Sequence, residues 1–191
     1  MQYDIEKLID MLILLYKNRQ TLSKLRITKL LYFIDKYHIR KYGRFVLNDR
    51  YHRLPLGPVP SLSLNYIDDF FNPASRIFRK KVERNPLEGY FAATKYRKYD
   101  ALSLKKDVNL NSLSDSDLEA VDYVIKKYGN FATSRLVNIS HNEKTWKETI
   151  ESKEIDPELF LDGLPEEEKE AIKKLIEIDQ ENDCVNVALN K

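Results

Sequence analysis

The sequence predicts an α+β fold in which helices predominate, with one small antiparallel β-sheet or hairpin between them. Apolar residues recur at helical spacing towards both ends of the chain. The interval of residues about 76 to 104 instead alternates weakly, is rich in aromatic residues and is broken by turn residues. Only five glycines and seven prolines occur in 191 residues, which argues against a loop-rich or disordered chain.

Two helices are expected before residue 43. The first covers about 5 to 17, with Asp4 as its N-cap, and the second covers about 25 to 42 and ends at Gly43. The second helix has its apolar residues at helical spacing, from which its charged residues are expected on the solvent side. The residues on the inward face are Ile27, Leu30, Leu31, Ile34 and the polar His38, and the charged ones are Lys29, Asp35, Lys36, Arg40 and Lys41.

A rigid corner is expected where the sequence reads Leu-Gly-Pro-Val-Pro, over residues 56–60. Two prolines fix φ there, and Gly57 suits a position with little room for a side chain or with a positive φ. Ser61 is then expected to cap a short helix that stops before Pro73.

The least regular part of the chain predicts strands. Residues 77–83 and 90–96 read as two β-like runs separated by a turn at 85–89, and residues 101–104 as a third.

Three helical segments and an acidic tail follow. Ser114 and Asp117 have capping-box spacing and open a helix that Gly129 closes, and residues 131–139 and 143–150 continue with shorter helices. Trp146 is expected in the core.

Residues 151–183 contain thirteen acidic and four basic residues, a local charge of −9, and include a last helix that begins near Pro165. We expect Ile172 and Leu175 to be buried against the body and Glu166 to Glu168 to be exposed. The alternative is a tail that orders only on a partner.

No catalytic or metal signature occurs. The three histidines have no metal-ligand spacing, His141 reads as structural, and the five glycines stand singly, so there is no phosphate-binding loop. The single cysteine, Cys184, cannot form an internal disulfide, and the longest apolar run, residues 11–15, is far too short for a membrane span. The sequence therefore predicts a cytoplasmic protein that is not an enzyme and carries no metal and no cofactor.

The order of these parts resembles the Panacea (SocA-like) antitoxin domain, in which a Lys-Leu-Leu-Tyr helix leads through Tyr-Gly-Arg into an Arg-rich strand and a Gly-Pro-Val corner. The residues that carry the resemblance are Lys29, Leu30, Leu31, Tyr32, Tyr42, Gly43, Arg44, Gly57, Pro58 and Val59, then Leu113-Ser114-Asp115, Lys127-Tyr128-Gly129, His141 and Trp146. The similarity spans residues about 5 to 150, and these motif residues are expected to be mainly structural. Thr145 departs from the pattern, because the family usually has proline directly before the tryptophan.

The resemblance implies an antitoxin domain over residues 1–150. Beyond it the acidic composition and helical spacing predict a helical extension over residues 151–191 that packs on this domain. The resemblance also implies a partner, because an antitoxin neutralises a cognate toxin by forming a complex with it.

Basic and tyrosine-rich segments are the strongest functional feature of the residues themselves, because such surfaces bind acidic proteins or nucleic acid. A solvated edge whose charges prevent aggregation is the alternative. The residues expected to contact a partner are Tyr37, Arg44, Tyr51, Arg53, Leu56, Arg79, Lys81, Tyr96 and Arg97.

An antitoxin that binds a toxin protein is thus the leading hypothesis. Three alternatives remain: an adaptor that delivers a bound protein to a protease, a nucleic-acid-binding autorepressor, and, least favoured, a hydrolase. No membrane partner is expected.

Overall fold

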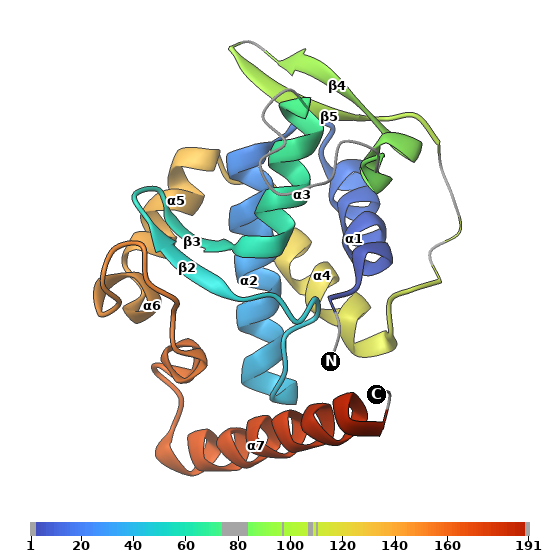
Figure 1. Cartoon of the computed structure of the whole chain (residues 1–191). Coiled ribbons are helices and arrows are strands. Elements are labelled where there is room, and N and C mark those ends of the chain that lie inside the picture. Colours follow the sequence, from blue (N-terminus) through green and yellow to red (C-terminus); the bar gives the residue numbers. More distant parts are fainter. Residues whose placement is uncertain (1–2, 74–83, 97, 107–108, 110, 190–191) are drawn as a thin grey trace.

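The computed structural model describes residues 3–73, 84–96, 98–106, 109 and 111–189, and the side chains of the last helix only as far as Ile178. Helices predominate and two small antiparallel sheets accompany them, which confirms the predicted fold class (Figure 1). The α-helices are α1 (Ile5–Asn18), α2 (Lys24–Tyr42), α3 (Ser61–Phe71), α4 (Asp115–Tyr128), α5 (Thr133–His141), α6 (Lys144–Lys147) and α7 (Glu166–Leu189). The strands are β1 (Leu22–Ser23), β2 (Tyr51–Leu54), β3 (Gly57–Pro60), β4 (Phe91–Tyr96) and β5 (Tyr99–Leu104), and the 3₁₀-helices are η2 (Pro86–Gly89) and η3 (Pro157–Leu161).

Helix α2 runs through the centre of the molecule and contacts α3, α4, α5, α7, η3 and β3 (Figure 1). Every residue from Arg26 to Asp35 is buried, so this helix is covered on all sides rather than along one stripe. The expectation that Lys29 and Asp35 face solvent is therefore wrong, since both are 0% exposed. At its ends the sequence pattern holds: Ser23 caps the helix, and Gly43 adopts the left-handed conformation with φ 72°.

The larger sheet has the strand order β1-β5-β4, and β4 and β5 form a hairpin in which Tyr96 lies opposite Tyr99. This hairpin accounts for the runs predicted at 90–96 and 101–104. The run predicted at 77–83 lies outside the described residues. Strand β1 was not predicted, because two residues leave no periodic signal.

The smaller sheet is the hairpin of β2 and β3, in which His52 lies opposite Val59. The predicted Gly-Pro-Val-Pro corner is thus a short strand, with Gly57 at φ 104° directly after the turn. The other edge of β2 is covered by residues 152–155, since the amide of Arg53 donates to the carbonyl of Lys153 at 3.0 Å.

Helix α3 begins without the predicted Ser61 cap. The carboxylate of Asp49 accepts hydrogen bonds from the amides of Leu62 and Ser63 at 2.8 and 2.7 Å, and Ser61 instead contacts the ring of His52. A carboxylate from the preceding loop thus satisfies the free amides at this helix start. The capping box predicted for α4 is present, between Ser114 and Asp117.

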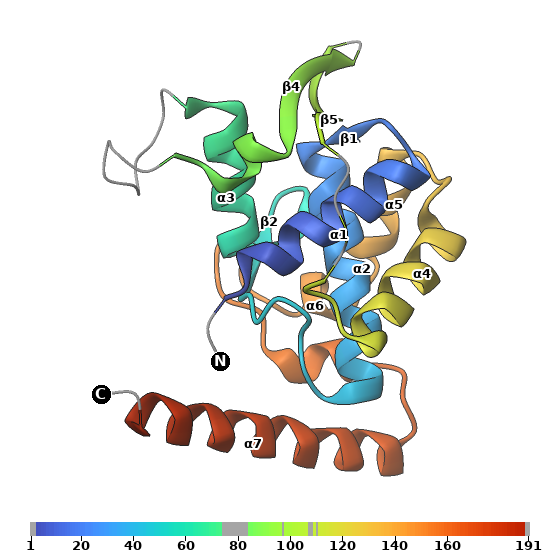
Figure 2. The same ribbon diagram turned by 90° about the vertical axis from the view of Figure 1, so that its right-hand side faces the viewer.

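Helix α7 lies across the end of the body where α2 finishes (Figure 2). Ile172 is buried and Glu166 to Glu168 are exposed, as expected, but Leu175 is 44% exposed and Ile176 packs against the core in its place. The two helices approach closely at Gly43, where an added Cβ would lie 2.5 Å from the Cβ of Leu175.

Candidate functional site

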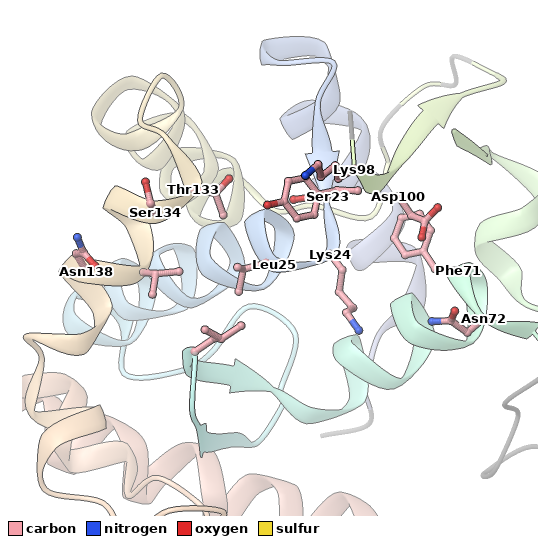
Figure 3. A pocket seen from close by; sticks show the side chains of 13 residues that line it. Ser23, Lys24, Leu25, Phe71, Asn72, Lys98, Asp100, Thr133, Ser134 and Asn138 are labelled. Carbon is pink, nitrogen blue, oxygen red and sulfur yellow. The ribbon is translucent and has the colours of Figure 1, made fainter. Parts of the chain in front are cut away.

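An open groove of about 580 Å³ lies at the N-terminal end of α2, and its lining is mainly apolar. Five parts of the chain that are distant in sequence form its walls: the start of α2, the β2–β3 turn, the end of α3, the β4–β5 turn and α5 (Figure 3). The lining residues are Ser23, Lys24, Leu25, Leu56, Phe71, Asn72, Lys98, Tyr99, Asp100, Thr133, Ser134, Val137 and Asn138.

Two large side chains in this groove are unusually exposed: Leu56 at 54% and Tyr99 at 66%. Leu56 lies in the turn of the β2–β3 hairpin and Tyr99 is the first residue of β5, so strand pairing holds their backbones while their side chains line the groove. Exposed leucine and tyrosine at an ordered concave surface are typical of protein–protein contacts. Of the residues predicted to contact a partner, the groove includes Leu56, and Tyr96, 44% exposed, lies opposite Tyr99 in the adjoining strand.

The other predicted contact residues do not gather here. Tyr51 is 1% exposed, because its side of β2 faces the core, and its hydroxyl donates to Asp35 at 2.7 Å. Burial, together with the Asp35 carboxylate, raises the pKa of Tyr51. Tyr37 is half-buried and donates to Glu119. Residues 79, 81 and 97 lie outside the described part of the chain.

A hydrogen bond from a buried lysine holds the backbone next to the turn that presents Leu56. The Nζ of Lys29 donates to the carbonyl oxygen of Pro58 at 2.7 Å, and among the described residues no carboxylate pairs with it. Burial lowers the pKa of Lys29 to about 7. Gly57 lies against the same group: an added Cβ would be 2.7 Å from this Nζ and 2.6 Å from the Oγ of Ser140.

An aromatic stack supports the turn from its other side. The rings of His141 and Trp146 stack with centroids 4.1 Å apart, the guanidinium of Arg53 lies 4.6 Å from the Trp146 ring, and the indole N–H donates to the carbonyl oxygen of Leu54 at 2.9 Å. Trp146 is half-buried, so its predicted place in the core is wrong. Burial lowers the pKa of His141, and the nearby Lys29 lowers it further.

Thr145, which stands where the family usually has proline, forms a hydrogen bond in the structure. Its hydroxyl and that of Tyr32 are 2.7 Å apart, and both residues are almost completely buried. Proline at this position would leave the Tyr32 hydroxyl without that partner.

The residues of the Lys-Leu-Leu-Tyr, Gly-Pro-Val and His–Trp motifs therefore meet in one place, although they lie between residues 29 and 146. A family model described as "Antitoxin SocA-like, Panacea domain" matches residues 27–147. The chain belongs to this antitoxin family. Searches of curated proteins and of solved structures found no match.

The Panacea segment runs from α2 to α6, and so α1 and α7 lie outside it. The described helices include none that is long and apolar enough to cross a membrane. Within the same described residues, no group of three or more His, Cys, Asp and Glu side chains could hold a metal ion.

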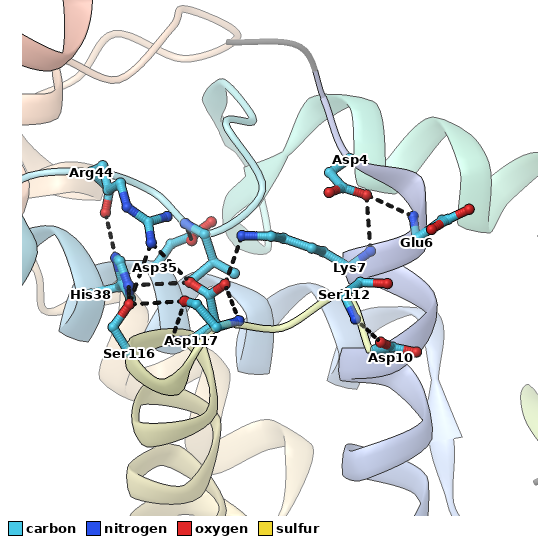
Figure 4. A network of polar contacts seen from close by, with 12 residues as sticks. Asp4, Glu6, Lys7, Asp10, Asp35, His38, Arg44, Ser112, Ser116 and Asp117 are labelled. Atoms are coloured by element: carbon cyan, nitrogen blue, oxygen red, sulfur yellow. Dashed lines mark hydrogen bonds and ion pairs between the residues drawn. The ribbon is translucent and has the colours of Figure 1, made fainter. Parts of the chain in front are cut away.

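A buried carboxylate joins the Panacea segment to α1. Asp117 accepts from Lys7 of α1 at 2.6 Å and lies 3.3 Å from both His38 of α2 and Arg44 (Figure 4). Burial alone would raise the pKa of Asp117, but the hydrogen bonds from His38, Lys7 and Ser114 outweigh it and hold the pKa well below its usual range. The guanidinium of Arg44, which was predicted to contact a partner, therefore pairs with Asp117 of the same chain.

The sequence predicts Asp117 only as part of a helix capping box. Its ion pairs were missed because they join residues 73 to 110 positions apart, and periodicity carries no signal for such contacts. The same holds for Arg26, whose buried guanidinium donates to the carbonyl oxygens of Gly129 and Phe131.

Proposed function

We propose that the chain is an antitoxin that neutralises a cognate toxin protein by direct complex formation, and that the toxin docks at the groove around Leu56 and Tyr99. The antitoxin role follows from the family. Other large apolar side chains are exposed too, Ile150 most of all, but Leu56 and Tyr99 line the same concave groove, and this is the observation that favours this place on the surface.

Rigid support of the groove favours tight binding. Lys29 fixes the β3 side of the turn through Pro58, and Trp146 fixes the β2 side through Leu54. A surface held in its binding conformation loses little conformational entropy when a partner docks. Complete burial of one such exposed leucine contributes about 1 to 2 kcal/mol, and a central tyrosine contributes more than about 1 kcal/mol.

Co-expression tests this proposal. The reading frame next to this gene is expressed alone, with the wild-type chain, and with a Leu56→Asp or Tyr99→Asp variant. The wild-type chain should restore growth and copurify with the toxin, and both variants should fail in each assay. Ile178→Asp is the matched control, because Ile178 is 53% exposed but lies on α7, at the opposite end of α2.

Circular dichroism and thermal melts of the purified variants establish that they fold. Folded Leu56→Asp and Tyr99→Asp proteins that still bind toxin as the wild type does would refute the groove as the docking site. If no neighbouring protein is toxic or bound, the antitoxin proposal itself fails.

Two other functions give different results in the same experiment. An adaptor for proteolysis would lower the amount of toxin in the cell, and deletion of the protease would abolish the rescue. An autorepressor would bind its own promoter in a gel shift without the toxin. We place the complex in the cytoplasm, since a chain with one cysteine forms no internal disulfide.

A further inference from the structure

A second cavity of about 460 Å³ lies between the outer faces of α2 and α4, and none of its residues lines the groove. Its walls are more polar than those of the groove and combine cations with aromatic rings. They are Phe33, Lys36, Tyr37, Arg40 and Lys41 of α2, Tyr123, Lys127 and Tyr128 of α4, and Glu143 and Asp162.

Positive charge exceeds negative charge in this cavity, with four cations against two carboxylates. Both carboxylates already have lysine partners, because Glu143 pairs with Lys36 and Asp162 pairs with Lys144 at 3.1 Å. Lys41 pairs with Glu119 of α4, which does not line the cavity. Arg40 and Lys127 are the remaining cations of the wall.

Two of these cations have only neutral acceptors. Arg40 donates to the carbonyl oxygens of Phe160 and Asp162 at 3.2 and 2.6 Å, and Lys127 donates to the hydroxyl of Tyr123 at 2.8 Å. Over the described residues, neither has a carboxylate within ion-pair distance. The hydrogen bond to Tyr123 raises the pKa of Lys127, so its ammonium group is charged at neutral pH.

Stacked rings form the rest of the wall. Tyr37 stacks on Tyr123 with centroids 4.2 Å apart, and Phe33 stacks on Tyr128 at 4.4 Å. Tyr123 is 36% exposed, so part of its ring is open to a ligand. Aromatic side chains next to basic ones bind the base and the phosphate of one nucleotide, respectively.

We propose that this cavity is a nucleotide site, in which phosphate contacts Arg40 and Lys127 and the base packs against Tyr123. The volume suits a ligand of that size, since small-molecule sites begin at about 300 Å³. The ligand is either a free nucleotide or one unit of a single nucleic-acid strand, because both present the same phosphate and base.

Titration calorimetry on the full chain tests the site with four probes: ADP, adenosine, inorganic pyrophosphate and a single-stranded hexanucleotide. ADP or the hexanucleotide should bind at least about tenfold more tightly than adenosine or pyrophosphate, because only they supply both base and phosphate. Tighter binding of ADP assigns the site to free nucleotides, and tighter binding of the hexanucleotide assigns it to a strand.

Lys127→Gln should weaken binding about tenfold, because it removes one charge-assisted hydrogen bond. Lys126→Gln is the matched control. It removes the same charge from the residue that precedes Lys127 in α4. Lys126 pairs with Asp122 and does not line the cavity.

Three results would overturn the proposal: no binding of ADP or the hexanucleotide at millimolar concentration, pyrophosphate binding as tightly as ADP, or equal losses from Lys127→Gln and Lys126→Gln. The last would show attraction by general surface charge.

Discussion

Replacing Gly57 by alanine perturbs the support of the turn that presents Leu56, by adding a single carbon atom against two neighbouring side chains. Gly57 has φ 104°, which an L-residue rarely adopts, and the new Cβ would lie 2.7 Å from the Nζ of Lys29 and 2.6 Å from the Oγ of Ser140. Both atoms are ends of side chains and can move. Lys29 is 0% exposed, however, so it would have to give up its bond to Pro58 inside the protein.

The expected cost has two parts. Backbone strain at positive φ contributes about 1 to 3 kcal/mol. Leaving a buried polar group without its hydrogen bond contributes about 1 to 3 kcal/mol. Together they predict a loss near 4 kcal/mol, or roughly 10 °C in melting temperature for a chain of this size.

Urea unfolding of three alanine variants separates the two parts. Gly89 has nothing within 4 Å and no positive φ, so Gly89→Ala should change stability by less than about 0.5 kcal/mol. Gly163 has φ 79° but open space, so Gly163→Ala reports the strain alone, about 1 to 2 kcal/mol. If Gly57→Ala costs no more than Gly163→Ala, the crowding by Lys29 has no energetic weight and the reasoning is wrong.

Two further predictions concern buried polar groups. In a double-mutant cycle followed by urea unfolding, Thr145→Val and Tyr32→Phe should each lower the free energy of unfolding by about 1 to 2 kcal/mol. The double variant should lose clearly less than the sum of the two, and strict additivity would contradict a hydrogen bond between them. Because burial lowers the pKa of Lys29 to about 7 from 10.5, the folded protein binds fewer protons than the unfolded chain between these values, so stability should rise with pH there. The rise from pH 7 to 9 should be about 2 kcal/mol larger in the wild type than in Lys29→Met, measured by denaturation at each pH, and parallel curves would exclude this role.

The parts of the fold that were predictable depend on local chemistry. Helix periodicity, the left-handed Gly43 and the capping box at Ser114 are properties of neighbouring residues, and the structure confirms all three. The Leu56 turn was recognised from its glycine and prolines, but β3 was not, because its strand character comes from pairing with β2.

The wrong placement of Lys29 and Asp35 has one physical cause. Lys29 and Asp35 were placed in solvent because charged residues rarely occur inside a protein without partners. Their partners are the carbonyl of Pro58 and, for Asp35, the Tyr51 hydroxyl and the Val46 amide, 11 to 29 residues away. Burial raises the pKa of Asp35 to about 6, so burying this carboxylate in its charged form costs free energy. The hydrogen bonds that offset this cost come from residues distant in the sequence, so the local sequence does not reveal them.

Under the proposed docking, support of the groove and recognition of the toxin fall on different residues. Lys29 is completely buried, and Gly57 has no side chain with which to touch a partner, so these motif residues decide whether the turn is held, not what it binds. Under the proposed docking, recognition rests on exposed positions such as Leu56 and Tyr99, whose side chains carry little of the fold. The two kinds of variant should therefore fail differently: Gly57→Ala should lower the melting temperature and also weaken toxin binding, because the turn loses the support of Lys29, whereas Tyr99→Asp should lose toxin at an unchanged melting temperature. A Tyr99→Asp protein that melts as early as Gly57→Ala would show that recognition and folding are not separated in this chain.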